Sequence, residues 1–444
     1  MNQQTQIERL QKACPDLTPL MVQDFVERMD HDYFEQFTLN VAAEHLTLVS
    51  SLTPETLCAI SIKKQPPKFF QLTIVAYDYF SEFATLCGLL SSFGLDIRQA
   101  TIYTYMDRRS ANRNQSSHIR RLTSGHSHST RPLKQPLGLF RKKVVDVFNV
   151  QLLPGCVFGK IQQTRFNNSV KDMINLLEHR HFRQVRNHVN RALVETLGRI
   201  DVQVPNVIHP VEIQFHNDRS PDSTVMDIRS TDIPAFLYTF ANALTMRGVY
   251  ISKANIQVQG HTAHNELFVQ GRSGEKIVKL DEQQELISTA ALLKEFSHYL
   301  TWAPDPGKAL EYFDQLLDEL YGSRKQSLGL SLLKDKNLLG HLAKLFGSSD
   351  FLWEDLLRRQ HANLLPAMSE FTEGSMIRTK KHLTRSLMSR MKKCHTTEER
   401  QACLNTFKDQ ELFRIDMKHL IDTATLEEFS TALSTLAEVV LEHA

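Results

Sequence analysis

Two aspartates, each followed by an apolar stretch with helical spacing, are the side chains of this sequence best suited to bind a small charged molecule. Asp78 precedes a stretch in which Phe83, Leu86 and Leu90 recur at helical intervals, and Asp232 precedes a second such stretch. A helix N-terminus offers unpaired N–H groups and a partial positive charge to a carboxylate, while an aspartate can bind an ammonium group. Together these groups suit a free amino acid. The alternative is that both aspartates only cap their helices.

The two aspartates occupy equivalent positions of an internal repeat. An offset of 232 − 78 = 154 residues places DYFSEFATLCGLLSSFGLDIRQATI over DIPAFLYTFANALTMRGVYISKANI. Both copies have a glycine, Gly94 or Gly248, where the helix should end, because glycine readily adopts the left-handed backbone that closes a helix. A duplicated segment of this kind predicts one domain that occurs twice.

The elements around each aspartate predict the fold of the repeated unit. β-rich runs at 69–77 and 223–230 precede the helices, and further strand-like runs follow, among them 143–151 and 265–270. Strand, helix, strand, strand and a later helix form the ferredoxin-like βαββαβ unit. Beyond about residue 282 helical periodicity replaces strand-like alternation. We therefore expect an α+β fold in which two such modules are followed by an all-α C-terminal region.

The length of 444 residues is too great for one hydrophobic core and predicts several domains. The boundaries we expect are a helical N-terminal segment (1–66), a first module (67–155), a helical linker (156–206), a second module (207–281) and the all-α region (282–444). The first module carries a basic insertion at about 106–142, rich in Arg, Ser, His and Asn, which we interpret as a solvated loop.

Other residues with the chemistry of metal ligands are better explained by structural roles. Asp30 and Asp32 have the spacing of a metal-binding carboxylate pair, but no Gly-Ser turn precedes them. The histidine pairs lack carboxylates or cysteines at ligand spacing; they are His126 and His128, His179 and His181, and His261 and His264. The six cysteines are scattered, which predicts reduced thiols. We expect no metal site and no catalytic residue in this chain.

Composition narrows the class of protein further. A net charge of +2 favours no nucleic-acid partner for the chain as a whole. No run of about 20 apolar residues is present, and the N-terminus lacks the pattern of a signal peptide. We therefore expect a cytoplasmic protein without a membrane partner.

Both copies resemble ACT domains, whose signature D-x-P-G-L-L follows the first strand. The second copy, Asp232-Ile233-Pro234-Ala235-Phe236-Leu237, fits this pattern except that Ala235 replaces glycine, whereas the first has neither the proline nor the glycine. The resemblance implies an amino-acid effector, with glutamine as the candidate. The implied effector-binding residues are Asp78, Tyr79, Phe80, Ser81 and Gly94 in the first copy and Asp232, Ile233, Pro234, Ala235 and Gly248 in the second.

Residues 290–444 resemble the region that leads into the nucleotidyltransferase domain of glutamine synthetase adenylyltransferase. The resemblance rests on LTWAPDPGKALEYFDQLLDEL, on LLGHLAKLFGSSDFLWEDLLRRQHANLL and on the last helices. It implies glutamine synthetase as partner, and PII signal protein as a further candidate. The G-S and D-x-D motif of that family is absent from the sequence, so we expect the chain to be inactive alone. Mg²⁺ and ATP are expected only for a full-length enzyme.

Three hypotheses about function follow. The first is the regulatory amino-acid-sensing and linker region of a glutamine synthetase adenylyltransferase, coupling nitrogen status to adenylylation and deadenylylation. The second is a stand-alone ACT-type binding protein that acts by protein–protein contact. The third is a relative of PII uridylyltransferases, in which the paired ACT domains normally follow the catalytic domain. We favour the first and regard the third as the weakest.

Overall fold

The computed structural model describes residues 3–30, 32–105, 141–197, 211–232, 235–300, 303–322, 336–348, 378–420 and 425–444. The chain divides into two compact units, Met1–Lys294 and Glu295–Ala444. Within the described part, none of the helices combines the length and the apolar character that a bilayer crossing demands.

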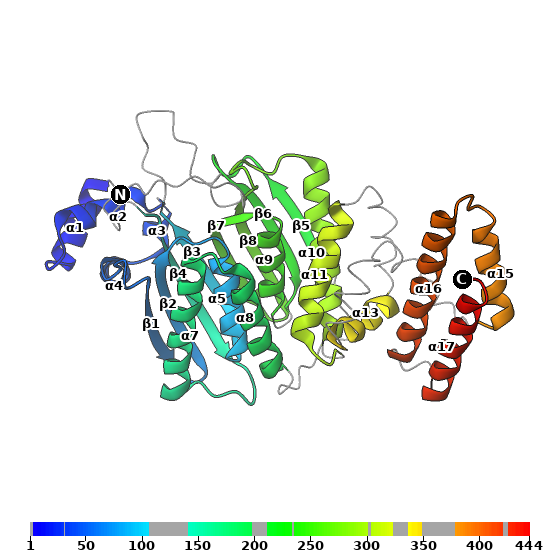
Figure 1. Ribbon diagram of the computed structural model, residues 1–444. Helices are drawn as coiled ribbons and strands as arrows, with labels where there is room; N and C mark the ends of the chain where they lie inside the picture. The colour runs from blue at the N-terminus through cyan, green and yellow to red at the C-terminus, as the bar shows by residue number, and fades with distance from the viewer. Residues whose placement is uncertain are drawn as a thin grey trace. The chain divides into compact units, whose positions relative to one another are not determined.

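An eight-stranded antiparallel sheet organises the described part of the first unit, with the strand order β1-β2-β4-β3-β7-β8-β6-β5 (Figure 1). Its strands are β1 (Cys58–Gln65), β2 (Phe69–Tyr77), β3 (Leu95–Thr104), β4 (Lys143–Leu152), β5 (Glu212–His216), β6 (Thr224–Thr231), β7 (Tyr250–Gln259) and β8 (Thr262–Gln270). The α+β fold predicted from the sequence is confirmed, and the sheet is consistent with two ferredoxin-like modules joined edge to edge.

Helices cover both faces of the half of this sheet that the first module forms. One face carries α5 (Glu82–Ser92), α7 (Lys160–Glu178) and α8 (Phe182–Leu197), and α9 (Phe236–Met246) continues this layer over the second module (Figure 1). The N-terminal helices are α1 (Gln3–Ala13), α2 (Pro19–Arg28), α3 (Tyr33–Gln36) and α4 (Leu39–Ser50). They pack on the other face, where Tyr103 of β3 and the buried Tyr105 just beyond it contact Tyr33 and Phe25. Helix α10 (Leu280–Tyr299) follows the last strand.

Each module has its outer strand in an unexpected place along the chain. The sequence predicted βαββαβ, but β1 and β5 come before the first helix of their modules and pair with β2 and β6. The order of elements is therefore β-β-α-β-β, and β1 lies in the segment 1–66 that we expected to be helical. Consecutive strands tend to pair. The outer strand of each module therefore reaches its place beside its neighbour through a connection at the start of the module, where the predicted fold would use a crossover at its end. The alternation of apolar residues in CAISIKKQ was the signal for β1.

The pairing of β3 with β7 shows that the repeat is also a spatial symmetry. In this antiparallel pair Thr101 lies opposite Asn255, and these two residues are separated by the same 154 positions as Asp78 and Asp232. An approximate two-fold axis therefore passes through this residue pair and exchanges the modules. The same axis brings the region around each aspartate against the central strand of the other module.

Helices α5, α8 and α9 approach closely at Gly88. A Cβ atom at this position would overlap Val189 Cγ1 of α8 and would lie 2.7 Å from Tyr238 Cδ2 of α9. Tyr238 is itself held in place, because its hydroxyl donates a hydrogen bond to Asn190 Oδ1. The glycine thus permits the contact that unites the helical layers of the two modules.

Gly88→Ala should lower the free energy of unfolding of the first unit by about 1–2 kcal/mol, because the added methyl group forces Val189 and Tyr238 apart. Gly271→Ala is the matched control, since its Cβ would meet nothing closer than 3.6 Å. Chemical denaturation of both variants measures the difference. Equal stability of the two variants would contradict the packing described.

The second unit is helical in its described residues, as the sequence predicted. Its helices are α11 (Pro306–Gly322), α13 (Lys336–Ser348), α15 (Lys380–Met391), α16 (Thr397–Leu420) and α17 (Leu426–Leu441). The last three share an apolar core formed by Leu383, Leu387, Leu404, Phe407, Leu436 and Val439. Helix α17 begins with a capping box, in which Thr425 and Glu428 satisfy each other's backbone N–H groups.

Candidate effector sites between the two modules

The aspartate of the second module binds an arginine of the first. Asp232 follows β6, and its Oδ2 accepts a hydrogen bond of 3.0 Å from Arg98 Nη1 of β3. The same arginine donates to Asp96 Oδ2 at 3.1 Å and to the carbonyl of Gly260 at 3.2 Å. The Asp232 N–H donates to the carbonyl of His261 at 2.8 Å. The cluster of Asp96, Arg98 and Asp232, which we name the arginine site, therefore crosses the boundary between the modules.

The arginine site carries two carboxylates and one cation. The side chains of Asp96, Arg98 and Asp232 are 18–25% exposed, so the cluster is shielded but reachable from solvent. The pKa of Asp232 is raised to about 6. Burial is the larger cause and the negative charge of Asp96 is the second, whereas Arg98 opposes the shift. A further positive group would relieve the repulsion between the carboxylates.

The aspartate of the first module occupies the symmetry-related position. Asp78 follows β2, its Oδ2 accepts a 2.6 Å hydrogen bond from the hydroxyl of Tyr250 in β7, and its N–H donates to the carbonyl of Lys142. A small cavity beside this bond is lined by Ser81, Glu82 and Tyr250, among others. It encloses about 20 Å³, which is room for about one water molecule. A larger ligand would have to displace side chains at this tyrosine site, formed by Asp78 and Tyr250.

Both sites adjoin a residue in the left-handed region of the backbone. Ser81 has φ 74° and Ala235 has φ 64°, and each is the residue just before the first helical residue of α5 or α9. The conformation costs roughly 1 kcal/mol for residues other than glycine. These are the positions where the ACT pattern has glycine, so the turn is kept in both modules although the glycine is not.

Two buried carboxyl groups lie behind the tyrosine site. Glu82 of α5 is 4% exposed and Asp146 of β4 is fully buried. Within the described residues, Glu82 Oε1 and both oxygens of Asp146 have no partner at ordinary hydrogen-bond geometry. Burial is the main cause that raises the pKa of both groups, and the negative charge of Asp78 adds to it; the pKa of Asp146 reaches about 8. The pair therefore holds protons at neutral pH.

The structure brings only some of the expected site residues together. Asp78 and Ser81 lie at the tyrosine site and Asp232 at the arginine site, while Ala235 lies just before α9, three residues after Asp232. Tyr79 also lines the small cavity. Ile233 and Pro234 are outside the described residues.

Three other expected residues lie away from the sites. Phe80 packs edge-on against Phe182 of α8. Gly94 and Gly248 follow the far ends of the 11-residue helices, with φ of 70° and 76°. An 11-residue helix is about 16 Å long, so these glycines are helix stops and do not contact the aspartates.

Sequence reasoning missed the partners of the aspartates, which are Asp96 and Arg98 in β3 and Tyr250 in β7. Their signal was available, because Asp96 and Tyr250 are also 154 positions apart. This signal could be interpreted only once the pairing of the modules was known, because each of these residues lies beside the aspartate of the other module.

The residues with metal-ligand chemistry have other partners. Asp30 and Asp32 both bind the ammonium group of Lys253. The ring of His179 stacks on that of His181, and His264 contacts Asp227 at 2.7 Å. Among the described residues, no group of three or more His, Cys, Asp or Glu could hold a metal ion. His126, His128 and most of the basic insertion lie outside the described residues.

Comparison with known proteins adds two findings. Residues 339–444 match the family model of glutamate-ammonia ligase adenylyltransferase. Over 150 residues the chain is also 27% identical to the bifunctional uridylyltransferase/uridylyl-removing enzyme of Rhodospirillum rubrum. This similarity covers 33% of the present chain and 15% of the relative, so the chain spans a small part of that enzyme's length. No solved structure matches.

The adenylyltransferase match falls within the second unit and includes α13, α15, α16 and α17. It supports the resemblance of residues 290–444 to glutamine synthetase adenylyltransferase. Both comparisons connect the chain with nucleotidyltransferase families.

Proposed function

We propose that the paired modules are ACT-type domains that bind a free amino acid, with glutamine as the first candidate, and regulate a nucleotidyltransferase to which the helical unit belongs. The observation that carries the proposal is the arginine site, where Asp232 of one module meets Arg98 of the other at 3.0 Å. An amino acid has the two charges that this cluster can satisfy.

The chemistry of the arginine site sets the orientation of the ligand. Its ammonium group would bind between Asp96 and Asp232, whose mutual repulsion it would relieve. Its carboxylate would bind Arg98 and the N-terminus of α9, since both are positive. Binding would thus replace part of the direct contact between Arg98 and Asp232. We favour this site over the tyrosine site because the cavity there has room for about one water molecule.

Regulation would follow from the position of the ligand between the modules. A ligand held by groups of both modules favours the arrangement in which those groups are closest, and it shifts the population by its difference in affinity. The proposed output is adenylylation and deadenylylation of glutamine synthetase, with PII signal protein as a further partner. Mg²⁺ and ATP would belong to a catalytic region, because Asp30 and Asp32 hold Lys253 and do not fit a metal site.

A second candidate output is uridylyl transfer and removal, which the similarity to the Rhodospirillum rubrum enzyme favours. The adenylyltransferase match of the second unit favours the first output. Binding of the chain to purified glutamine synthetase, with PII signal protein in a parallel measurement, separates the two.

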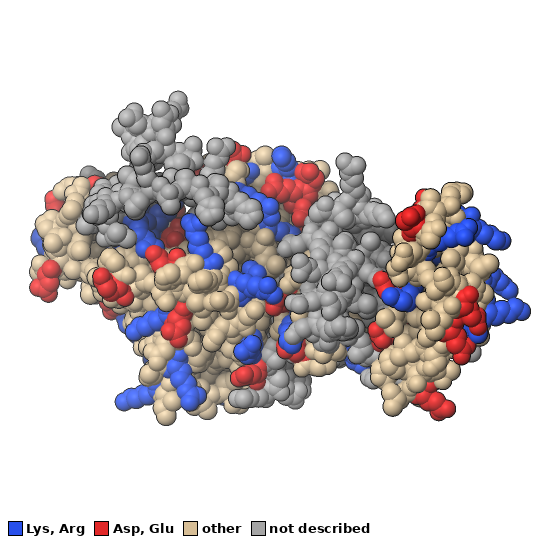
Figure 2. Space-filling model, in the orientation of Figure 1, with Lys and Arg blue, Asp and Glu red and all other residues tan. Residues whose placement is uncertain are grey.

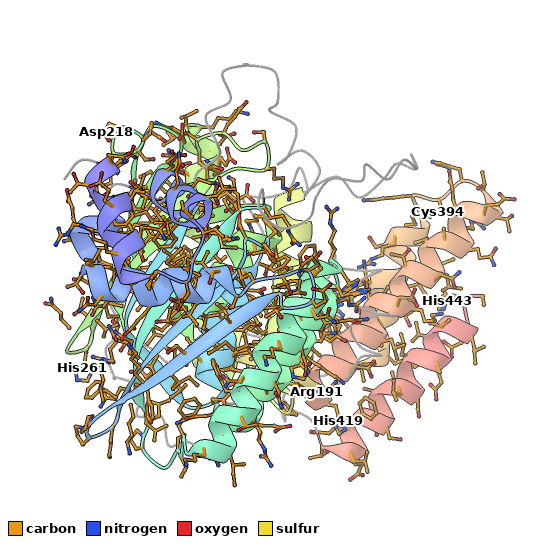
Figure 3. The ribbon with its side chains drawn as sticks, turned by 90° about the vertical axis from the view of Figure 1, so that its left-hand side faces the viewer. Arg191, Asp218, His261, Cys394, His419 and His443 are labelled. Carbon is orange, nitrogen blue, oxygen red and sulfur yellow. The ribbon has the colours of Figure 1, made fainter. Side chains whose placement is uncertain are left out.

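Calorimetric titration with each of the twenty amino acids tests the proposal. We expect saturable heat for glutamine or another amino acid, and a loss of about tenfold or more in affinity for Asp232→Ala, because a charge-assisted contact is removed. Asp218→Ala is the matched control, since Asp218 is exposed in the turn between β5 and β6, at the opposite end of the module from His261 (Figure 3). Circular dichroism checks that both variants fold. Absence of heat with all twenty amino acids would overturn the proposal.

A further inference from the structure

A second cavity lies on the opposite face of the sheet, between the N-terminal helices and the start of β4. Its walls are formed by Met21, Asp24, Leu46, Val49, Ser50, Leu52, Thr53, Pro54, Tyr105 and Lys143. It encloses about 220 Å³. For comparison, an engineered apolar cavity of about 150 Å³ in another protein binds benzene. The space is therefore sufficient for a small branched or aromatic group.

The charged groups at this cavity do not balance. Arg28 is 4% exposed, lies 4.9 Å over the ring of Tyr105, and has Nη1 3.9 Å from Asp24 Oδ1. Asp24 is thus compensated by Arg28. Among the described residues, no carboxylate oxygen lies within 4.0 Å of the ammonium group of Lys143. The remaining charge at the cavity is positive.

Burial acts on the same lysine. It is the main cause that lowers the pKa of Lys143; the charge of Asp24 opposes the shift and that of Arg28 adds to it. A buried charge is normally paired or hydrogen-bonded. The ammonium group lies 5.9 Å from the ring centre of Tyr105, and an anion at this position would add a carboxylate partner to that contact.

We propose that this cavity binds a small carboxylate with a branched or aromatic apolar tail. The carboxylate pairs with Lys143, and the tail fills the space between Leu46 and Val49 of α4 and Met21 of α2. An α-amino group would lie in an apolar pocket whose acidic residue is already compensated. The cavity therefore prefers the simple carboxylate to the amino acid with the same side chain.

The site has a direct connection to the tyrosine site. Lys143 lies opposite Tyr77 in the pairing of β4 with β2, and the carbonyl of the preceding Lys142 accepts the N–H of Asp78. The ligand would therefore contact Lys143, the residue next to the one whose carbonyl holds the N–H of Asp78.

Titration with sodium 3-methylbutanoate, with its uncharged amide and with leucine tests the proposal on the full chain. We expect saturable binding of 3-methylbutanoate, with at least about tenfold weaker binding of the amide and of leucine. Lys143→Met should cause a similar loss, whereas the control Lys142→Met should retain wild-type affinity. Asp232→Ala should also retain it, which separates this site from the proposed amino-acid site.

Several outcomes would overturn the proposal. They are no saturable binding of 3-methylbutanoate, equal affinity for the acid and its amide, and leucine binding as tightly as the acid to the Asp232→Ala variant, in which the proposed amino-acid site is removed. The comparison of acid and amide uses only the wild-type chain, so it stays decisive even where a variant fails to fold.

Discussion

Replacing Asp146 by asparagine should stabilise the first unit by an amount that grows between about pH 4 and 8, and should leave its stability nearly unchanged below about pH 4. Asp146 is fully buried in β4 beside Glu82, and burial raises the pKa of Asp146 to about 8. At high pH the wild-type protein must keep a negative charge in its core or unfold. The asparagine has the same shape without that charge.

The sign of the effect follows from the direction of the pKa shifts. Both carboxyl groups have a higher pKa in the folded state than in the unfolded chain, so the folded state binds more protons between about pH 4 and 8. The stability that the protonated groups contribute is complete at low pH and is lost as the pH rises through about 8. A single group changes the free energy of unfolding by up to ~1.4 kcal/mol per pH unit.

Chemical denaturation at several pH values, followed by the near-ultraviolet circular dichroism of tyrosine, measures this dependence. We expect the wild-type midpoint to fall steeply between about pH 4 and 8 and the midpoint of Asp146→Asn to fall less. Asp172→Asn, an exposed change on α7, should reproduce the wild-type curve. Parallel curves for wild type and Asp146→Asn would show that Asp146 is not the group that titrates.

Most of what could be predicted about the fold came from the internal repeat. Two copies at one offset predicted equivalent strands, helices and stop glycines, because the local patterns in the two copies confirm each other. The outer strands were missed for the opposite reason. A strand of five residues such as β5 offers little periodicity, and its place in the sheet depends on a partner elsewhere in the chain.

The candidate sites were predicted only in part because their second halves are not local. The aspartates could be found from the helix that each precedes, but Arg98 and Tyr250 reach them through the pairing of β3 with β7. The buried pair of Glu82 and Asp146 was also beyond the sequence. Residues 64 positions apart, 146 − 82, meet only when α5 packs on the sheet.

The charges of the molecule also required the structure. The sequence predicted no preference for polyanions from the net charge alone. Among the side chains of the first unit that Figure 2 shows in colour, acidic and basic residues are interspersed. The exceptional charges are instead buried, at Asp146 and Lys253, and their contacts are visible only in the structure.

Lys253→Met should loosen the N-terminal helices from the sheet and lower the free energy of unfolding by about 2–4 kcal/mol. Lys253 is 9% exposed, and its ammonium group binds Asp30 at 3.2 Å and Asp32 at a short contact. It also lies 4.9 Å and 4.8 Å from the ring centres of Tyr103 and Phe268. The variant leaves two neighbouring carboxylates without their shared cation, although their partial exposure reduces the cost.

Limited proteolysis of residues 1–50 and chemical denaturation measure the two effects. Lys63→Met is the matched control, because Lys63 pairs with Glu44 at the surface, where each side chain is about half exposed. Such a pair contributes less than about 1 kcal/mol. Equal effects of the two substitutions would mean that Lys253 does not anchor the N-terminal segment.

The same pair of variants decides how the D-x-D spacing of Asp30 and Asp32 should be interpreted. If these carboxylates are a counter-charge for Lys253, MgCl₂ should leave the stability of the wild-type chain unchanged, because the lysine occupies the place of a cation. In Lys253→Met the carboxylates are freed, and Mg²⁺ should restore part of the lost stability. Stabilisation of the wild type by Mg²⁺ would instead assign the two aspartates to a metal site. The spacing of two carboxylates therefore indicates metal binding only where no lysine or arginine of the protein already binds them.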